Sequence, residues 1–140
     1  LITPVQALRF INHIASRGET PQLRLNISKE ISYYDKIVYT EKAWNHIWDG
    51  MFDVVNADQG SGWRARLKDP DIKLLGKTST AENPHGEPHA WFIGFFEVEG
   101  TKYSIVVMIE NGGGGGAVAS PIAGDIVSYY INSFKSLAKN

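Results

Sequence analysis

The fold is decided by one stretch of the sequence, Gly76-Lys77-Thr78-Ser79-Thr80-Ala81-Glu82-Asn83-Pro84-His85-Gly86-Glu87-Pro88-His89-Ala90-Trp91-Phe92-Ile93-Gly94-Phe95. Its first part places a lysine and three hydroxyl side chains on consecutive positions, and its last part is an aromatic, apolar segment typical of a strand. The prolines and glycine between these parts favour a polar turn over a helix. We therefore expect two strands, with the lysine and the hydroxyls on a strand edge that can hold an anion.

A third strand follows this stretch. Glu99-Gly100 has the composition of a two-residue hairpin turn, so the second and third strands should pair antiparallel. Residues 103–109 are almost continuously apolar, which suits a strand covered on both faces. An antiparallel sheet of about three strands packed with helices, an α+β fold, is expected, with strands at about 72–82, 89–97 and 102–110.

Helices are predicted before and after these strands, at about 4–17, 41–56 and 120–137. Each begins at a threonine or serine that can cap its first turn, and proline follows the cap in the first and third helices. Apolar residues recur at helical spacing on the faces that should be buried. These residues are Ala7, Leu8, Ile11, Ile14 and Ala15, then Trp44, Ile47, Trp48, Met51, Val54 and Val55, and finally Ile122, Ile126, Tyr129, Tyr130 and Leu137.

The remaining segments are less regular. Residues 22–27 alternate like a strand, whereas residues 31–39 show no firm period. Residues 56–62 have the composition of a loop, and the arginines that follow it should lie on a solvated face. Asn111–Gly116 reads as a five-glycine loop, for which we favour backbone freedom over an anion-binding nest.

The composition excludes several functions. A chain of 140 residues that is 43% hydrophobic and 21% charged can form one globular domain. Its formal net charge of -1 gives no basic field for nucleic acid. The absence of cysteine excludes disulfides, a thiol nucleophile and a thiolate metal site. The apolar runs are far shorter than the roughly 20 residues that a membrane helix needs.

Three further motifs match known functional sites, but a simpler interpretation is favoured for each. Gly76-Lys77-Thr78 matches the end of a phosphate-binding loop, but Asp71 stands where the first glycine is needed. His85 and His89 have the spacing of a helical metal pair, but the prolines forbid a helix, so we favour a structural or substrate-lining role. Ser136 and Lys139 match a Ser-x-x-Lys pattern at the end of the chain, which we interpret as coincidence.

The chain resembles the penicillin-binding proteins, most closely the class B, elongation-type D,D-transpeptidases. The resemblance is carried by residues 77–95 and by matches in the same order over nearly the whole chain. These are Thr3-Pro4-Val5-Gln6, Gly50-Met51-Phe52-Asp53-Val54-Val55-Asn56, Glu110-Asn111-Gly112-Gly113 and Ala119-Ser120-Pro121-Ile122-Ala123-Gly124. The resemblance implies a sheet of five strands in the complete domain.

The resemblance implies roles for individual residues. Lys77 would supply positive charge near the nucleophile and the substrate carboxylate, and Thr80 would give a backbone N–H to the oxyanion hole. The hydroxyls of Thr78 and Thr80 would bind the terminal carboxylate of a D-Ala-D-Ala stem peptide or of a β-lactam. Lys77 and Thr80 are thus the candidate catalytic residues, and Thr78, Ser79 and Thr80 the candidate substrate-binding residues. His89 and Trp91 are candidates for the lining of the cleft. No cofactor, metal or nucleic acid is implied.

Two of the family's three motifs, Ser-x-x-Lys and Ser-x-Asn, have no counterpart at the expected places. Residues 1–140 therefore resemble the C-terminal portion of a transpeptidase domain, with the nucleophile outside this chain. The domain's first strand would also be missing, so the apolar edge of residues 102–110 should pair with the N-terminal part of the same protein or with another copy. The resemblance implies the bacterial cell envelope, at the outer face of the cytoplasmic membrane.

One residue departs from the family pattern. The third motif reads Lys-Thr-Gly in the family, whereas Ser79 stands here in place of the glycine. A side chain at this position should crowd a ligand that lies along the strand. The alternative is a non-catalytic binding or scaffold module on the same fold, with a degenerate site.

Overall fold

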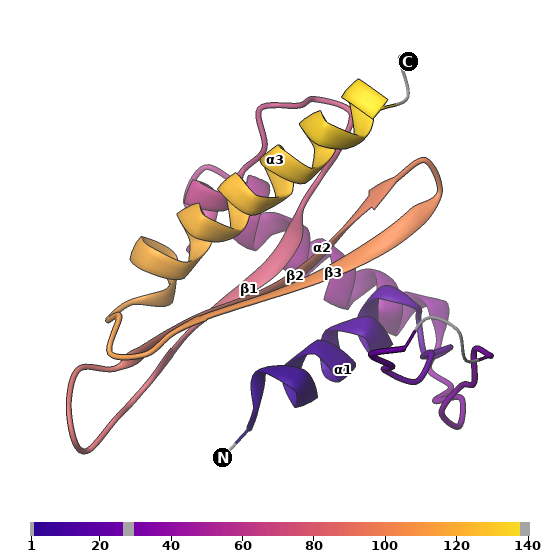
Figure 1. Ribbon diagram of the computed structural model, residues 1–140, viewed down its shortest axis with the longest axis horizontal. Coiled ribbons are helices and arrows are strands. Elements are labelled where there is room, and N and C mark those ends of the chain that lie inside the picture. The colour runs from indigo at the N-terminus through magenta and orange to yellow at the C-terminus, as the bar shows by residue number, and fades with distance from the viewer. Residues whose placement is uncertain (1, 27–29, 138–140) are drawn as a thin grey trace.

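The strands predicted from residues 72–110 form one sheet, and helices cover both of its faces (Figure 1). The computed structural model describes residues 2–26 and 30–137. In it, β1 (Leu75–Ala81), β2 (His89–Val98) and β3 (Thr101–Ile109) pair antiparallel in the order β1-β2-β3. The expected α+β architecture is confirmed.

The hairpin between β2 and β3 forms at the predicted turn. Glu99 and Gly100 both have positive φ, 47° and 76°, as a two-residue turn of type I′ requires. Val98 pairs with Thr101 across this turn, and the register continues to the pair Ala90 and Ile109. The turn therefore fixes which side chains of β2 and β3 share a face of the sheet.

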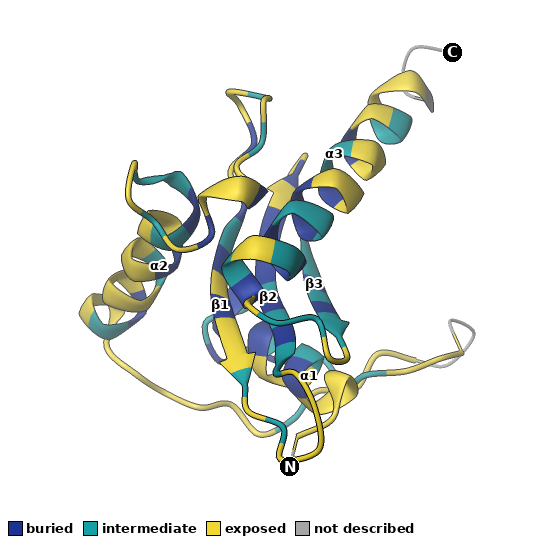
Figure 2. Cartoon of the chain, turned by 90° about the vertical axis from the view of Figure 1, so that its left-hand side faces the viewer, coloured by how far each residue is buried: buried dark blue, intermediate teal, exposed yellow. Residues whose placement is uncertain are grey.

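Each face of the sheet packs against its own helices. We call the side against α3 (Ser120–Leu137) the α3 face and the side against α1 (Pro4–Ala15) the α1 face (Figures 1 and 2). The α3 face contributes Phe92 and Val107 to the larger core, and the α1 face contributes Phe95 to a second core with residues of α1 and α2 (Glu41–Asn56). Burial of both faces explains the nearly continuous apolar run of β3.

Glycines let the β1–β2 pair approach its core closely. Gly76 pairs with Gly94, and the fully buried ring of Phe92 lies against both residues. A Cβ at Gly76 would lie 2.2 Å from Phe92 Cζ. The aromatic ring thus occupies space that any larger residue at Gly76 would need.

The helix ends follow from local chemistry. Thr3 and Gln6 form the capping box that starts α1, and the Thr40 side chain caps α2. Helix α1 ends at Ala15 instead of the predicted residue 17, because Arg17 and Gly18 take positive φ values of 51° and 95°. Helix α2 has the predicted bounds, but its Ile47 is exposed instead of buried.

The buried side of α3 differs from the prediction. Ile126 and Tyr129, expected in the core, are 50% and 77% exposed. The buried hydrophobic residues are small or branched and recur every fourth position, namely Ala119 in the turn before α3 and Ala123, Val127 and Ile131 within it. Small residues let the helix approach closely, since Gly124 lies against the backbone of Ala65. The Leu137 side chain lies outside the described residues.

Three expected boundaries also change. Gly115 and Gly116, assigned to a glycine loop, belong to the π-helical turn Gly115–Ala119, which leads into α3. Residues 72–74 precede β1, although Ile72 and Leu74 are buried. Residues 22–26 form no strand, because the nearby pairing is a single bridge between Pro21 and Tyr33. Residue 27 lies outside the described residues.

Within residues 2–26 and 30–137, no helix has the length and apolar character needed to cross a bilayer.

The packing of Phe92 on Gly76 predicts opposite effects for two glycine substitutions. Gly76→Ala should lower the free energy of unfolding by roughly 1–3 kcal/mol, since the added methyl overpacks the core. Gly50→Ala is the control, because no atom lies within 4 Å of a Cβ at this exposed helical position. It should raise stability by about 0.5–1 kcal/mol. Urea unfolding measures both effects, and equal stabilities for the two variants would contradict this packing.

Candidate functional site

Strand β1 is an edge of the sheet, and it carries the four consecutive residues that the sequence singled out. Within the described chain its outer side has no strand partner, since β1 pairs with β2 alone. Lys77, Ser79 and Thr80 are exposed, whereas Thr78 is only 8% exposed. Lys77, Ser79 and Thr80 are therefore accessible to a ligand from solvent, whereas Thr78 is largely covered.

The alternation of side chains along β1 divides these residues between the two faces. Thr78 pairs with Phe92, a residue of the α3-face core, and Thr80 lies two positions further along the same face. Lys77 and Ser79 lie on the α1 face, where Ser79 pairs with Trp91. The two threonine hydroxyls are thus neighbours, and Ser79 projects beside the lysine.

Thr80 is held by the glycine-rich segment. The backbone N–H of Gly115 donates a hydrogen bond of 3.2 Å to Thr80 Oγ1. Gly115 is buried, and a Cβ there would lie 2.2 Å from the carbonyl oxygen of Ser79 and 2.5 Å from that of Trp91. The glycine therefore packs directly on β1 and β2, and the hydroxyl proton of Thr80 remains free to be donated.

Thr78 is held by the loop that follows α2. Its Oγ1 lies 2.8 Å from the Oγ of Ser61, a normal distance for a hydrogen bond between hydroxyls. Either oxygen can be the donor in this pair. The loop therefore closes over Thr78 and leaves Ser61 itself exposed.

Lys77 carries a charge without a carboxylate partner in the part of the chain that the structure describes. Its Nζ donates a hydrogen bond of 2.6 Å to the main-chain carbonyl of Thr78. The side chain is thereby held along β1 while its remaining N–H groups can meet an anion. A cation and two hydroxyls on one exposed edge form an arrangement suited to a carboxylate.

The residues expected to line a cleft are both on the α1 face. Trp91 is half-buried and lies across from Ser79, so the structure brings it next to Lys77 and Ser79. His89 lies two residue pairs further along the strands, opposite Ala81, and its Nδ1 accepts a hydrogen bond of 2.9 Å from the backbone N–H of Asn111. His89 therefore also fixes the start of the glycine-rich segment.

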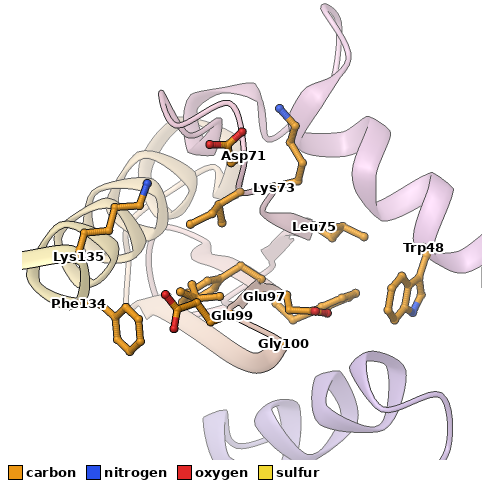
Figure 3. Close-up of a pocket in the computed structure, with 13 residues that line it drawn as sticks. Trp48, Asp71, Lys73, Leu75, Glu97, Glu99, Gly100, Phe134 and Lys135 are labelled. Carbon is orange, nitrogen blue, oxygen red and sulfur yellow. The ribbon is translucent and has the colours of Figure 1, made fainter. Parts of the chain in front are cut away.

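Other candidate sites do not coincide with this edge. A cavity of about 590 Å³ lies at the β2–β3 hairpin end of the sheet, between Trp48 and Lys135 (Figure 3). A second cavity, of about 530 Å³, lies between α1 and residues 34–37. Neither is lined by any residue from Lys77 to Thr80. Among the described residues, no three His, Asp or Glu side chains are grouped to hold a metal ion.

The alternative motifs do not form the sites that their patterns describe. Lys77 lies within β1 and not at the start of a helix, so the phosphate-loop interpretation of Gly76-Lys77-Thr78 does not apply. Ser136 lies at the end of α3, and Lys139 lies outside the described residues. Arg66, expected on a solvated face, is exposed but donates hydrogen bonds to the carbonyls of Val55 and Ala57 at the end of α2.

Two contacts of the site were not anticipated from the sequence. Ser61 appeared only as part of a loop, and Gly115 only as part of a flexible glycine run. The contact of Gly115 could have been inferred from its place in a glycine run next to a strand, since such glycines permit close backbone approach. The contact of Ser61 joins residues 17 positions apart, and no local pattern indicates it.

The sequence and the fold of this chain are similar to those of known proteins. The sequence matches the penicillin-binding protein transpeptidase domain family over residues 1–128. It is 30% identical to the peptidoglycan D,D-transpeptidase MrdA of Haemophilus influenzae over 155 aligned residues, which cover 93% of this chain and 24% of that protein. The chain thus spans about a quarter of the length of this relative.

Solved structures show the same fold. Penicillin-binding protein A of M. tuberculosis, in a ceftriaxone acyl-enzyme complex, superposes with a TM-score of 0.71 at 26% identity, covering 90% of this chain and 32% of that chain. PBP2 of Helicobacter pylori, in a complex with MreC, superposes with a TM-score of 0.70 at 25% identity, covering 94% of this chain and 24% of that chain. The chain therefore belongs to the penicillin-binding protein transpeptidase family, which confirms the resemblance to class B D,D-transpeptidases drawn from its sequence.

Proposed function

We propose that this chain is the C-terminal portion of the transpeptidase domain of a peptidoglycan D,D-transpeptidase. It binds D-Ala-D-Ala stem peptides and β-lactams, which react with a serine nucleophile that lies outside this chain. The observation that carries the proposal is the placement of the Thr78 and Thr80 hydroxyls on one face of the edge strand β1, with Lys77 next in the chain to Thr78. Such a group of donors fits the terminal carboxylate of a peptide.

Different residues of β1 bind the substrate carboxylate and polarise the reacting carbonyl. The hydroxyls of Thr78 and Thr80 donate to the terminal carboxylate, while Lys77 supplies positive charge near the carboxylate and the attacking serine. The backbone N–H of Thr80 donates to the oxyanion that forms when the serine oxygen attacks the carbonyl carbon. Collapse of this intermediate breaks the peptide C–N bond, and the leaving amine takes up a proton. An acceptor amine then attacks the acyl-enzyme and forms the cross-link.

Apolar side chains left uncovered on the α1 face support the proposal that another part of the complete protein packs against this side of the site. Trp91, Ile93 and Met108 are only partly buried on this face. The α1 residues Val5 and Phe10 are also exposed, at 63% and 53%. An apolar surface of this kind suits packing against the segment that carries the nucleophile.

The relatives guide the choice of ligand, partner and location. The M. tuberculosis relative forms an acyl-enzyme with ceftriaxone, which supports β-lactam binding by the β1 edge of this chain. The H. pylori relative forms a complex with MreC, which supports a protein partner of the same kind for the complete protein. We place the protein in the bacterial cell envelope, at the outer face of the cytoplasmic membrane where peptidoglycan is cross-linked.

A second candidate function is a non-catalytic binding or scaffold module. Ser79 favours it, because its side chain lies on the same face as Lys77, where a reacting carbonyl would approach. A degenerate module would keep the fold and the carboxylate contacts but would form no acyl-enzyme. The experiments below distinguish the two functions.

Acylation of the complete protein by a fluorescent penicillin tests the proposed function. We expect a covalent, denaturation-resistant label, and we expect Lys77→Ala to lower the second-order acylation rate constant roughly 10- to 150-fold, the equivalent of about 1.5–3 kcal/mol for a charge-assisted contact. Lys73→Ala is the control, because Lys73 is exposed and lines the cavity at the other end of the sheet. A complete protein that takes up no label would instead be the non-catalytic module.

Ser79→Gly tests whether the departure from the family pattern matters. If the Ser79 side chain must leave its preferred rotamer when a ligand binds, its removal should raise the acylation rate roughly two- to tenfold. Ser79→Ala is the control, because it keeps the Cβ and should give a smaller gain. Equal acylation rates for the natural protein and Ser79→Gly would rule out crowding.

The outer edge of β3 gives a structural prediction. In the described chain β3 pairs with β2 alone, and its central residues Ile105 and Val107 are buried. We propose that the N-terminal part of the same protein, or another copy, pairs with this edge. In residues 101–109, every second backbone N–H points to the outer edge, away from β2. In the complete protein these amides should then exchange slowly with deuterium. Fast exchange of these same amides would show a bare edge and contradict the proposal.

A further inference from the structure

Ser61 is the one side chain that reaches the hydroxyl of Thr78 among the described residues. The two hydroxyl oxygens lie 2.8 Å apart, and Thr78 is 8% exposed. Ser61 belongs to the loop of residues 57–62, which joins α2 to the 3-10 helix Trp63–Ala65. The contact therefore links the end of one helix to the middle of the edge strand.

The backbone around Ser61 is tightly held. Gly62 donates a hydrogen bond of 2.8 Å to the carbonyl of Val54, and a Cβ at Gly60 would lie 2.3 Å from that same carbonyl oxygen. On the other side, a Cβ at Gly116 would lie 2.3 Å from the Ser61 carbonyl oxygen. Because glycines permit these close approaches, Ser61 is fixed between α2 and the glycine-rich segment.

The hydrogen bond between the two hydroxyls has two arrangements. If Thr78 donates to Ser61, the Thr78 proton is occupied and cannot meet a ligand. If Ser61 donates to Thr78, the Thr78 proton is free. An ionised carboxylate accepts hydrogen bonds and cannot donate them, so it selects the second arrangement. The consecutive hydrogen bonds from Ser61 to Thr78 and from Thr78 to the carboxylate also strengthen one another.

Thr80 shows the same arrangement with a backbone donor. The N–H of Gly115 can only donate, so the bond of 3.2 Å to Thr80 Oγ1 leaves the Thr80 proton free. When Ser61 is the donor, its hydroxyl has the same effect on Thr78 as the N–H of Gly115 has on Thr80. In that arrangement a protein donor occupies a lone pair of each threonine oxygen and leaves the hydroxyl proton for a ligand.

We propose that Ser61 is a positioning residue for carboxylate recognition, acting through Thr78. It fixes the rotamer of Thr78 and directs the Thr78 proton to the ligand carboxylate, without itself contacting the substrate. The inference rests on the proposed function and deepens it, since it explains how the acceptor-only carboxylate is distinguished from a neutral group at the same place. Its effect therefore depends on the charge of the ligand.

The test uses acylation of the complete protein by penicillin. Ser61→Ala should lower the second-order acylation rate constant about three- to tenfold, the effect expected for one hydrogen bond. Ser61→Thr keeps the hydroxyl on an exposed side chain and should retain most of the rate. The melting temperature of both variants should stay close to that of the natural protein, because the side chain is exposed.

Two further measurements separate positioning from a general structural role. With a penicillin whose carboxylate is methylated, Ser61→Ala should change the rate less than twofold, because a neutral ester is a weaker acceptor. In a Thr78→Val variant, Ser61→Ala should not lower the acylation rate with penicillin any further, because Ser61 acts only through the hydroxyl of Thr78.

The outcomes are distinct. An unchanged rate in Ser61→Ala overturns the inference and leaves the proposed function standing. An equal loss with penicillin and with its methyl ester also overturns it, since the loss then comes from the fold of the loop. A natural protein that forms no acyl-enzyme overturns the proposed function, and the inference falls with it. A loss confined to the charged ligand, restored by Ser61→Thr, supports the inference.

Discussion

The antiparallel pairing of β1 with β2 is the constraint on which the site depends. Its register fixes the direction of every side chain from Lys77 to Thr80, because a shift by one residue would exchange the two faces. The register is itself enforced by packing, since the buried ring of Phe92 fits only over the paired glycines Gly76 and Gly94. The core of the sheet and the direction of the candidate binding groups therefore have one physical cause.

The same pairing places the threonine hydroxyls and the lysine of the candidate site on opposite faces of the sheet. The Thr78 and Thr80 hydroxyls lie on the α3 face, where Thr78 shares a hydrogen bond with Ser61 and Thr80 accepts one from the N–H of Gly115. Lys77 lies on the other face, held to the main chain and without a carboxylate partner in the described residues. In the proposed enzyme, the hydroxyls hold the terminal carboxylate while the lysine acts beside the incoming serine.

Much of this arrangement could be predicted from the sequence, and the rest could not for identifiable reasons. The strands, the hairpin turn and the Lys77 edge follow from local signals, namely alternation, Glu99-Gly100 and the family motif. The α3 prediction was wrong for Ile126 and Tyr129, because the helix packs on the sheet through the row of Ala123, Val127 and Ile131. The contacts of Ser61 and Gly115 join distant parts of the chain, so they appear only once the fold brings them together.

A crystal structure of the complete protein acylated by a β-lactam would show how β1 holds the ligand carboxylate. We expect the carboxylate to lie within about 3 Å of both Thr78 Oγ1 and Thr80 Oγ1, the usual length for an O–H donor to a carboxylate. We also expect the hydrogen bonds of Thr78 with Ser61 and of Thr80 with Gly115 to be retained. A carboxylate bound elsewhere, out of contact with both threonine hydroxyls, would contradict the proposed role of β1.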